Sequence, residues 1–334
     1  MTTYAVDNID DAVTATRQFL LPFTVIRWLK LALVVFLIGA GMNVPTSGFN
    51  APTSGGQLPS ELLPGAGFPP ALSDGVLIFA GFVLISIILI TLVWEFISST
   101  MEFIFVESLR QGDVTIQRYW SARWRQGVRL LAFRIAIVVP LVLFVIGWVA
   151  IILTPLLMGG APPVTYEIGV LLGVPLLLLA GLMVALISGF TTLFVVPIMI
   201  VEDCGVLTGW KRLWQTIKAE WIQYLAYAFF HVVMGFVLGM LAALVSVVIL
   251  FVVLLVFLVF GALLYVTGVF PSTIGYVLVG LLALAFVVVA ITVSLFVQVP
   301  VLAYLRYYAL LVLGDVEESL DLIPEQRAAI RAGE

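Results

Sequence analysis

Two carboxylates and two hydroxyl groups lie at helical spacing within an apolar stretch of the sequence. Glu95, Ser98, Ser99 and Glu102 occupy positions i, i+3, i+4 and i+7 of "WEFISSTMEF", so a helix would place all four on one face. Carboxylates in apolar surroundings move protons or ions, hold a polar headgroup, or form ion pairs that fix helices together. The spacing therefore predicts a polar stripe that points toward other helices.

Other apolar segments carry polar residues at a similar depth, namely Arg134, His231, Gln298 and Arg306. With the carboxylates they predict one buried polar cluster. Two interpretations stay open: an ion- or proton-coupled pathway or headgroup pocket, and a structural Glu–Arg or Glu–His pair that fixes helix register. We favour the structural pair, because polar groups between membrane helices often serve packing alone.

Composition narrows the classes of protein that the 334 residues can form. Hydrophobic residues make up 63% of the chain and charged residues 10%, and the net charge is −4. The acidic balance argues against nucleic-acid binding. One cysteine, Cys204, and one histidine, His231, argue against disulfides and metal sites. We find no catalytic motif, and therefore expect neither a cofactor nor an enzyme. The acidic start lacks the basic region of a signal peptide, so we expect no cleavage.

Long apolar segments predict an all-α membrane protein, because each is long enough to cross a bilayer of about 30 Å. Six spans are predicted, at about 19–41, 76–106, 130–158, 166–201, 221–267 and 276–313. The fifth would be a helix of about 69 Å at 1.5 Å per residue. A turn at Gly235 or Gly239 could split it, but we favour one long, tilted or kinked helix.

The basic residues predict which side of the membrane each loop faces. The loops at 43–74, 159–167 and 267–275 contain no Lys or Arg, and all fifteen bases lie in the other segments. Because cytoplasmic loops are rich in Lys and Arg, both ends, residues 1–18 and 314–334, are predicted to be cytoplasmic in a plasma-membrane protein. The duplicated "PTSG" and six prolines at 43–74 predict an irregular loop.

Amphipathic stretches recur before the spans. Two of them have tryptophan on one face and bases on the other, which suits the headgroup layer. The predicted lipid contacts are Arg118, Trp120, Trp124, Arg125 and Arg129 in one copy and Trp210, Lys211, Trp214, Lys218 and Trp221 in another. A weaker copy, "DAVTATRQFLLPF", begins the chain. The pattern predicts three repeated units, each with an amphipathic cytoplasmic helix followed by two spans.

Two stretches carry a family resemblance. "FVVPIMIVEDCGVLTGWKRLWQTIKAEWIQYLAYAF" resembles the membrane domain found ahead of some glycerophosphodiester phosphodiesterases, and "VPVLAYLRYYALLVLGD" with "LDLIPEQRAAIR" resembles uncharacterised haloarchaeal membrane proteins. The phosphodiesterase catalytic domain has no counterpart in the chain, so its activity is not implied.

These observations predict a non-enzymatic scaffold or accessory component of the membrane. The alternative is a transporter or lipid-handling protein that uses the Glu95/Glu102 cluster, and an intramembrane enzyme comes third. The expected partners are membrane lipids and other membrane proteins, and the oligomeric state stays open.

Overall fold

The computed structural model describes residues 4–39, 74–157, 164–270 and 272–332, and all the regular structure within them is helical. The elements are α1 (Tyr4–Leu20), α2 (Val25–Ile38), α3 (Asp74–Gln111), α4 (Ile116–Leu157), α5 (Val164–Phe190), the π-helical turn η3 (Thr191–Val195), α6 (Val196–Val201), α7 (Val206–Ala219), α8 (Trp221–Val266), α9 (Thr273–Val316), the 3₁₀ turn η4 (Glu318–Leu320) and α10 (Pro324–Ala332). Within these described ranges, five helical stretches are long and apolar enough to span a membrane, namely Ile78–Gln111, Ile116–Ile152, Leu171–Val201, Trp221–Val266 and Thr273–Val316.

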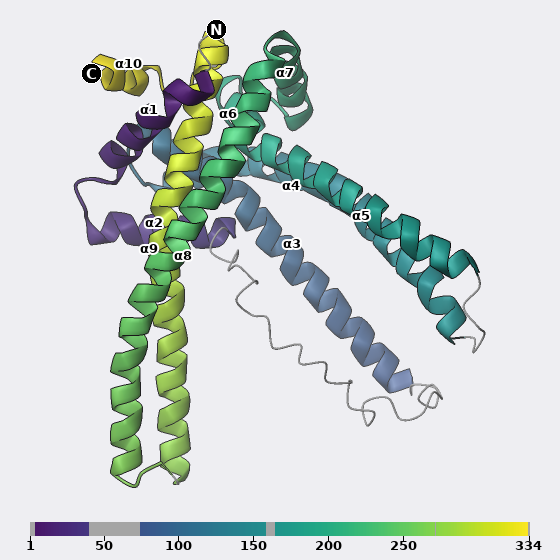
Figure 1. Cartoon of the computed structure of the whole chain (residues 1–334), viewed down its shortest axis with the longest axis vertical. Coiled ribbons are helices and arrows are strands. Elements are labelled where there is room, and N and C mark those ends of the chain that lie inside the picture. Colours follow the sequence, from purple (N-terminus) through teal and green to yellow (C-terminus); the bar gives the residue numbers. More distant parts are fainter. Residues whose placement is uncertain (1–3, 40–73, 158–163, 271, 333–334) are drawn as a thin grey trace.

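The helices meet at one end of the molecule and separate at the other (Figure 1). We call the packed end the hub; it comprises residues 4–38, 94–134, 187–231 and 296–332. Three arms leave it: the outer part of α3, the α4–α5 hairpin and the α8–α9 hairpin. Among the described residues, every buried hydrophobic side chain except Ala242 lies in the hub. All fifteen bases also lie there, so the hub is both the core and the charged end.

Aromatic side chains from separate helices fill the centre of the hub. Tyr227 of α8 stacks on Tyr308 of α9 with ring centroids 5.2 Å apart, and Phe194 of η3 meets Tyr227 edge-on at 4.8 Å. All three rings are buried. Such pairs contribute about 0.5–1.5 kcal/mol beyond the area that they bury, so they fix the approach of α5 and α6 to the α8–α9 pair.

A close approach of α3 and α4 depends on glycine. A Cβ atom added at Gly127 would overlap the Thr100 hydroxyl oxygen and would lie 3.0 Å from the Thr100 Cα, closer than nearly all such contacts in proteins. Thr100 is fully buried and its hydroxyl donates to the carbonyl of Phe96. The absence of a side chain at Gly127 therefore lets the two helix backbones come together inside the hub.

The predicted span at 19–41 is wrong as a single helix. Helix α1 ends at Leu20, and α2 begins at Val25 and has 14 residues, or about 21 Å at 1.5 Å per residue. Pro22 explains the break, because it disfavours helical geometry at the preceding residue and cannot donate a backbone hydrogen bond. Arg27 and Lys30 of α2 donate to the carbonyls of Gly112 and Val114. This short helix therefore anchors the inner end of α3.

Two other predicted segments are parts of long continuous helices. Helix α8 is one continuous helix of 46 residues, so neither Gly235 nor Gly239 splits it. The amphipathic stretch 116–129 and the span that follows form a single helix of 42 residues, α4. The predicted irregular loop at 43–74 lies almost entirely outside the described residues, and so does most of the loop at 159–167.

The amphipathic stretches close the hub into a ring. Residues 116–129 of α4 pack on α3, α7 packs on η3 and α6, and α1 packs on α9. Each stretch thus contacts the hub end of a long helix that returns to the hub. The first stretch, α1, covers the hub end of α9, which is the last long helix. The ring brings the beginning and the end of the described chain together.

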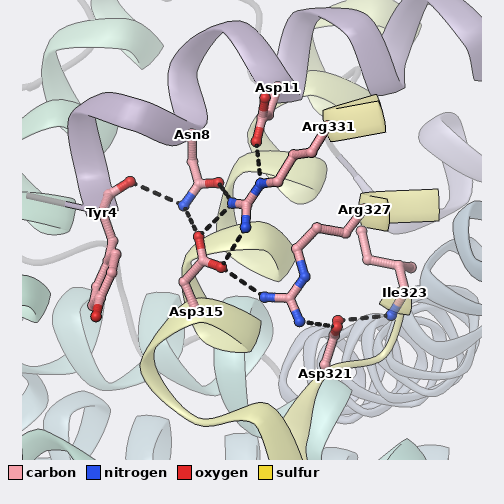
Figure 2. Close-up of polar contacts among 8 residues, drawn as sticks. All are labelled: Tyr4, Asn8, Asp11, Asp315, Asp321, Ile323, Arg327 and Arg331. Carbon is pink, nitrogen blue, oxygen red and sulfur yellow. Dashed lines mark hydrogen bonds and ion pairs between the residues drawn. The ribbon is translucent and has the colours of Figure 1, made fainter. Parts of the chain in front are cut away.

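Ion pairs fasten this closure (Figure 2). Asn8 of α1 donates to Asp315 of α9 at 2.8 Å, and Arg331 of α10 donates to Asp11 at 3.0 Å and to Asp315 at 2.7 Å. Arg327 donates to Asp315 and Asp321. We call these six residues the terminal cluster. The Asp315 carboxylate thus accepts hydrogen bonds from α1 and from α10 at once.

Candidate functional site

A proline frees one carbonyl group in the middle of the hub. In the π-helical turn the Val196 N–H donates to the carbonyl of Thr191, five residues earlier. The same pattern would pair the Thr192 carbonyl with residue 197, but Pro197 has no N–H. Arg306 of α9 donates to the Thr192 oxygen instead, at 2.7 Å. The π turn thus creates an acceptor that reaches across to another helix.

Arg306 also binds the buried carboxylate of Glu102. Its Nη2 donates to Glu102 Oε2, and the two side chains are 6% and 5% exposed. One guanidinium therefore joins α3, η3 and α9. Arginine suits this position, because its planar fork holds two acceptors at once and stays charged when buried.

Arg134 of α4 extends the contact into a ladder of alternating charge. Its guanidinium lies 3.5 Å from Glu102 and 3.6 Å from Glu95. The hydroxyl oxygens of Ser98 and Ser99 accept weak hydrogen bonds from it at 3.5 and 3.4 Å. We call Glu95, Arg134, Glu102 and Arg306 the charge ladder. Its two acids and two bases cancel, which a set of ions in an apolar environment requires.

The predicted polar stripe is buried along most of its length. Ser98, Ser99 and Glu102 are buried in the hub, and Ser98 donates to the Ile38 carbonyl at the end of α2. The side chain of Glu95 is 43% exposed, because it lies where the arm of α3 leaves α4. Glu95 is therefore the accessible end of the ladder, and Glu102 its centre.

His231 and Gln298 are not members of the ladder. The His231 ring bonds the Tyr227 hydroxyl at 3.0 Å. It also lines a recess of about 300 Å³ with Ser188, Thr192 and Arg306. Gln298 makes no hydrogen bond to the ladder in the described part of the chain. It precedes Arg306 by eight residues, and that spacing rotates its side chain about 80° away around α9.

A second polar network joins α3, α4 and the end of α6. Arg123 lies 3.4 Å from Glu107, and Gln126 donates to the Met199 carbonyl and to Asp203 at 3.0 and 2.8 Å. The sequence prediction missed it, although Glu107 and Asp203 follow the spans in "VESLRQGD" and "VEDCG".

The tryptophans of the amphipathic stretches divide into two groups. Trp120 packs edge-on against Phe96, and Trp210 donates its indole N–H to Thr191 at 2.9 Å, so these two belong to the hub. The remaining predicted contacts of this type are exposed: Trp124, Trp214 and Trp221. Only the second group is free to reach lipid.

Six of the fifteen bases make no side-chain hydrogen bond or ion pair with the described residues. All are exposed, and all lie on the amphipathic stretches: Arg17 on α1, Arg118, Arg125 and Arg129 on α4, and Lys211 and Lys218 on α7. Arg125 and Lys218 lie over the rings of Trp124 and Trp214. The other nine bases contact acids or carbonyl oxygens. The unpaired positive charge of the hub therefore lies on the exposed faces of the amphipathic stretches, which we call the rim.

The four residues of the charge ladder are arranged as ion pairs between helices. Among the described residues no group of three or more His, Cys, Asp or Glu side chains could hold a metal ion.

The model of a family of unknown function, DUF7544, matches residues 3–323. The chain belongs to this family. No curated protein and no solved structure matches it.

Proposed function

We propose that this DUF7544 protein is a non-enzymatic integral membrane protein, a scaffold or accessory component whose hub holds the membrane-spanning helices at one end. The observation that carries the proposal is the charge ladder. Arg306 is bound both to a carboxylate and to the carbonyl freed by Pro197. Breaking a buried ion pair costs about 3–5 kcal/mol. A ladder that joins α3, α4, η3 and α9 therefore acts as a clamp.

The proposed orientation places the hub on the cytoplasmic side of the plasma membrane. All fifteen bases lie in the hub, and the positive-inside rule assigns that end to the cytoplasm. The terminal cluster holds α1 and α10 at this same end, so the chain crosses the membrane an even number of times. Because five candidate spans are described, we propose six crossings in all.

The same ring supports three repeated units. Helices α4 and α7 each carry tryptophan at their fifth and ninth positions, counted from Ile116 and Val206. In both helices the first tryptophan packs inward and the second is exposed. Helix α1 takes the corresponding place on α9. Membrane lipids and other membrane proteins remain the proposed partners.

Thermal unfolding of purified variants tests the clamp. Glu102→Gln should destabilise the protein, because Arg306 and Arg134 keep their charges while their shared partner is neutralised. Glu95→Gln is the matched control, since this residue is half-exposed and binds Arg134 alone. Equal melting temperatures for the two variants would contradict the clamp.

Transport or lipid handling is the second candidate function. Two observations favour it: Glu95 is accessible at the end of the ladder, and Arg306, whose Nε lacks a partner, lines the 300 Å³ recess. A proton flux into proteoliposomes that is lost in Glu95→Gln, with the fold intact, would establish this function. The scaffold proposal expects no flux above that of empty vesicles from either protein.

A further inference from the structure

An apolar groove lies between α1, α8 and α9, and Figure 1 shows α1 beside the hub end of α9. Its volume is about 660 Å³, within the range of roughly 300–1,000 Å³ that is typical of ligand sites. Val13 of α1, Leu238 and Leu241 of α8 and Pro300 of α9 are among the residues that line it. Carbon atoms thus form almost the whole of its wall.

One cation breaks this apolar lining. Arg17 of α1 lines the groove, its side chain is exposed, and it has no hydrogen-bond or ion-pair partner among the described residues. The two bases of the neighbouring helix differ, because Arg27 and Lys30 both donate to backbone carbonyls of the hub. The positive charge of Arg17 is therefore available to a ligand.

The exposed acid of α1 that is nearest to Arg17 in sequence is Asp10. Its neighbour Ile9 lines the groove. Arg17 follows Asp10 by seven residues, or about 10 Å along the helix axis. An elongated ligand can therefore place a negative group at Arg17 and keep it away from Asp10.

We propose that this groove binds one anionic phospholipid from the surrounding bilayer, with an acyl chain between α8 and α9 and the phosphate on Arg17. The apolar wall requires a ligand that is mostly hydrocarbon, and the unpaired guanidinium requires one anionic group. Leu241 and Val245 are 52% and 45% exposed, so the groove opens onto the lipid-facing side of the α8–α9 arm. Basic pockets between membrane helices at the cytoplasmic side select anionic headgroups in this way.

The bound lipid would contact both the first and the last helices of the ring, because α1 contributes Arg17 and α8 and α9 form the apolar wall of the groove. This site is separate from the charge ladder, whose bases are already paired. The clamp can therefore fail its test without affecting the lipid site, and the reverse also holds.

Native mass spectrometry of the delipidated full-length protein tests the proposal. Phosphatidylglycerol and phosphatidylcholine with identical acyl chains are titrated separately. We expect a first phosphatidylglycerol to bind the wild type more tightly than phosphatidylcholine. Arg17→Gln should weaken that first site about fivefold, the effect of one base near an anionic lipid, and Arg17→Lys should keep most of the affinity. Val13→Trp should fill the groove and weaken both lipids.

The matched control is Arg118→Gln, which removes an unpaired, exposed base that lies outside the groove. It should leave the first site unchanged. The proposal is overturned if Arg118→Gln weakens binding as much as Arg17→Gln, if Val13→Trp binds lipid as the wild type does, or if free glycerol phosphate displaces the lipid. Arg17 and Val13 are exposed, and unchanged thermal unfolding of their variants confirms that the fold is intact.

Discussion

The same helices form the hub and the arms, but their apolar residues are buried in the hub and exposed in the arms. In α9, Val299 and the run Ala309–Leu313 are buried, whereas Ile274, Leu281 and Val288 nearer the tip are more than half exposed. The most apolar 18-residue windows of the five candidate spans are at most 6% buried. Hydrophobicity alone therefore does not select which helices pack together.

The difference shows what does select packing within a membrane. Lipid tails are as apolar as leucine, so an exposed arm gains little by moving from lipid to protein. The hub instead contains polar and small residues that recognise particular partners: the charge ladder, and Gly127 against Thr100. Within the arms, helices meet as hairpins, as where Trp148 of α4 donates to the Gly169 carbonyl of α5.

The largest expected effect comes from removing the centre of the charge ladder. Glu102→Leu leaves Arg306 without its acid in the hub, and should lower the free energy of unfolding by about 3–5 kcal/mol. Ile85→Ala truncates a side chain that is 59% exposed in the α3 arm, and should change it by less than about 0.5 kcal/mol. Denaturant titration in detergent measures both. Similar losses for the two variants would remove the distinction between hub and arms.

Glycines within α4 give a sharper test in one helix. Gly127→Ala should cost about 1–3 kcal/mol, because the added Cβ meets the backbone of Thr100. Gly147→Ala lies further along α4 with no heavy atom within 4 Å of its Cβ, and should be neutral or stabilise by up to about 1 kcal/mol. The melting temperatures of the two variants are compared. A lower melting temperature for Gly147→Ala than for Gly127→Ala would contradict the expected order.

The terminal cluster should hold α10 against the rest of the hub. Asp315→Asn removes the carboxylate that accepts hydrogen bonds from Asn8, Arg327 and Arg331. It should therefore destabilise the docking of α10 by about 1–2 kcal/mol. Hydrogen exchange of α10 amides reports it. Asp10→Asn is the control, and equal exchange in the two variants would exclude a role for Asp315.

The smallest effect is expected at the rim. Trp124 is 43% exposed, so Trp124→Ala should change the free energy of unfolding by less than about 1 kcal/mol while weakening contact with the headgroup layer. Trp120→Ala removes a ring that packs on Phe96 and should destabilise more. Detergent melts compare the two, and the reverse order would place Trp124 in the core.

The sequence predicted the parts of the fold that depend on helix length and hydropathy. The bounds of α8 follow from an uninterrupted apolar run, and the closeness of Glu102 to Arg134 follows from their depth in adjacent segments. It failed at α2, because hydropathy continues through Pro22 although helical geometry does not.

The partner of Arg306 could not be predicted either, because the Thr192 carbonyl becomes free only when a π turn forms before Pro197. Helical periodicity assigns faces to side chains and does not report which backbone group has lost its donor. The terminal cluster was missed for a similar reason: Asn8 and Asp315 are 307 residues apart in sequence, and their contact depends on closure of the whole ring.

Because the ring is closed, the packing of the units against one another does not depend on where the chain begins. Helices α1 and α10 lie against each other at the hub, so a short linker could join them without disturbing α9. The chain could then be opened in the turn between α6 and α7, where residues 202–205 connect the two helices. Such a circular permutant would keep the helix-to-helix contacts of the ring and would place both new ends on the hub side.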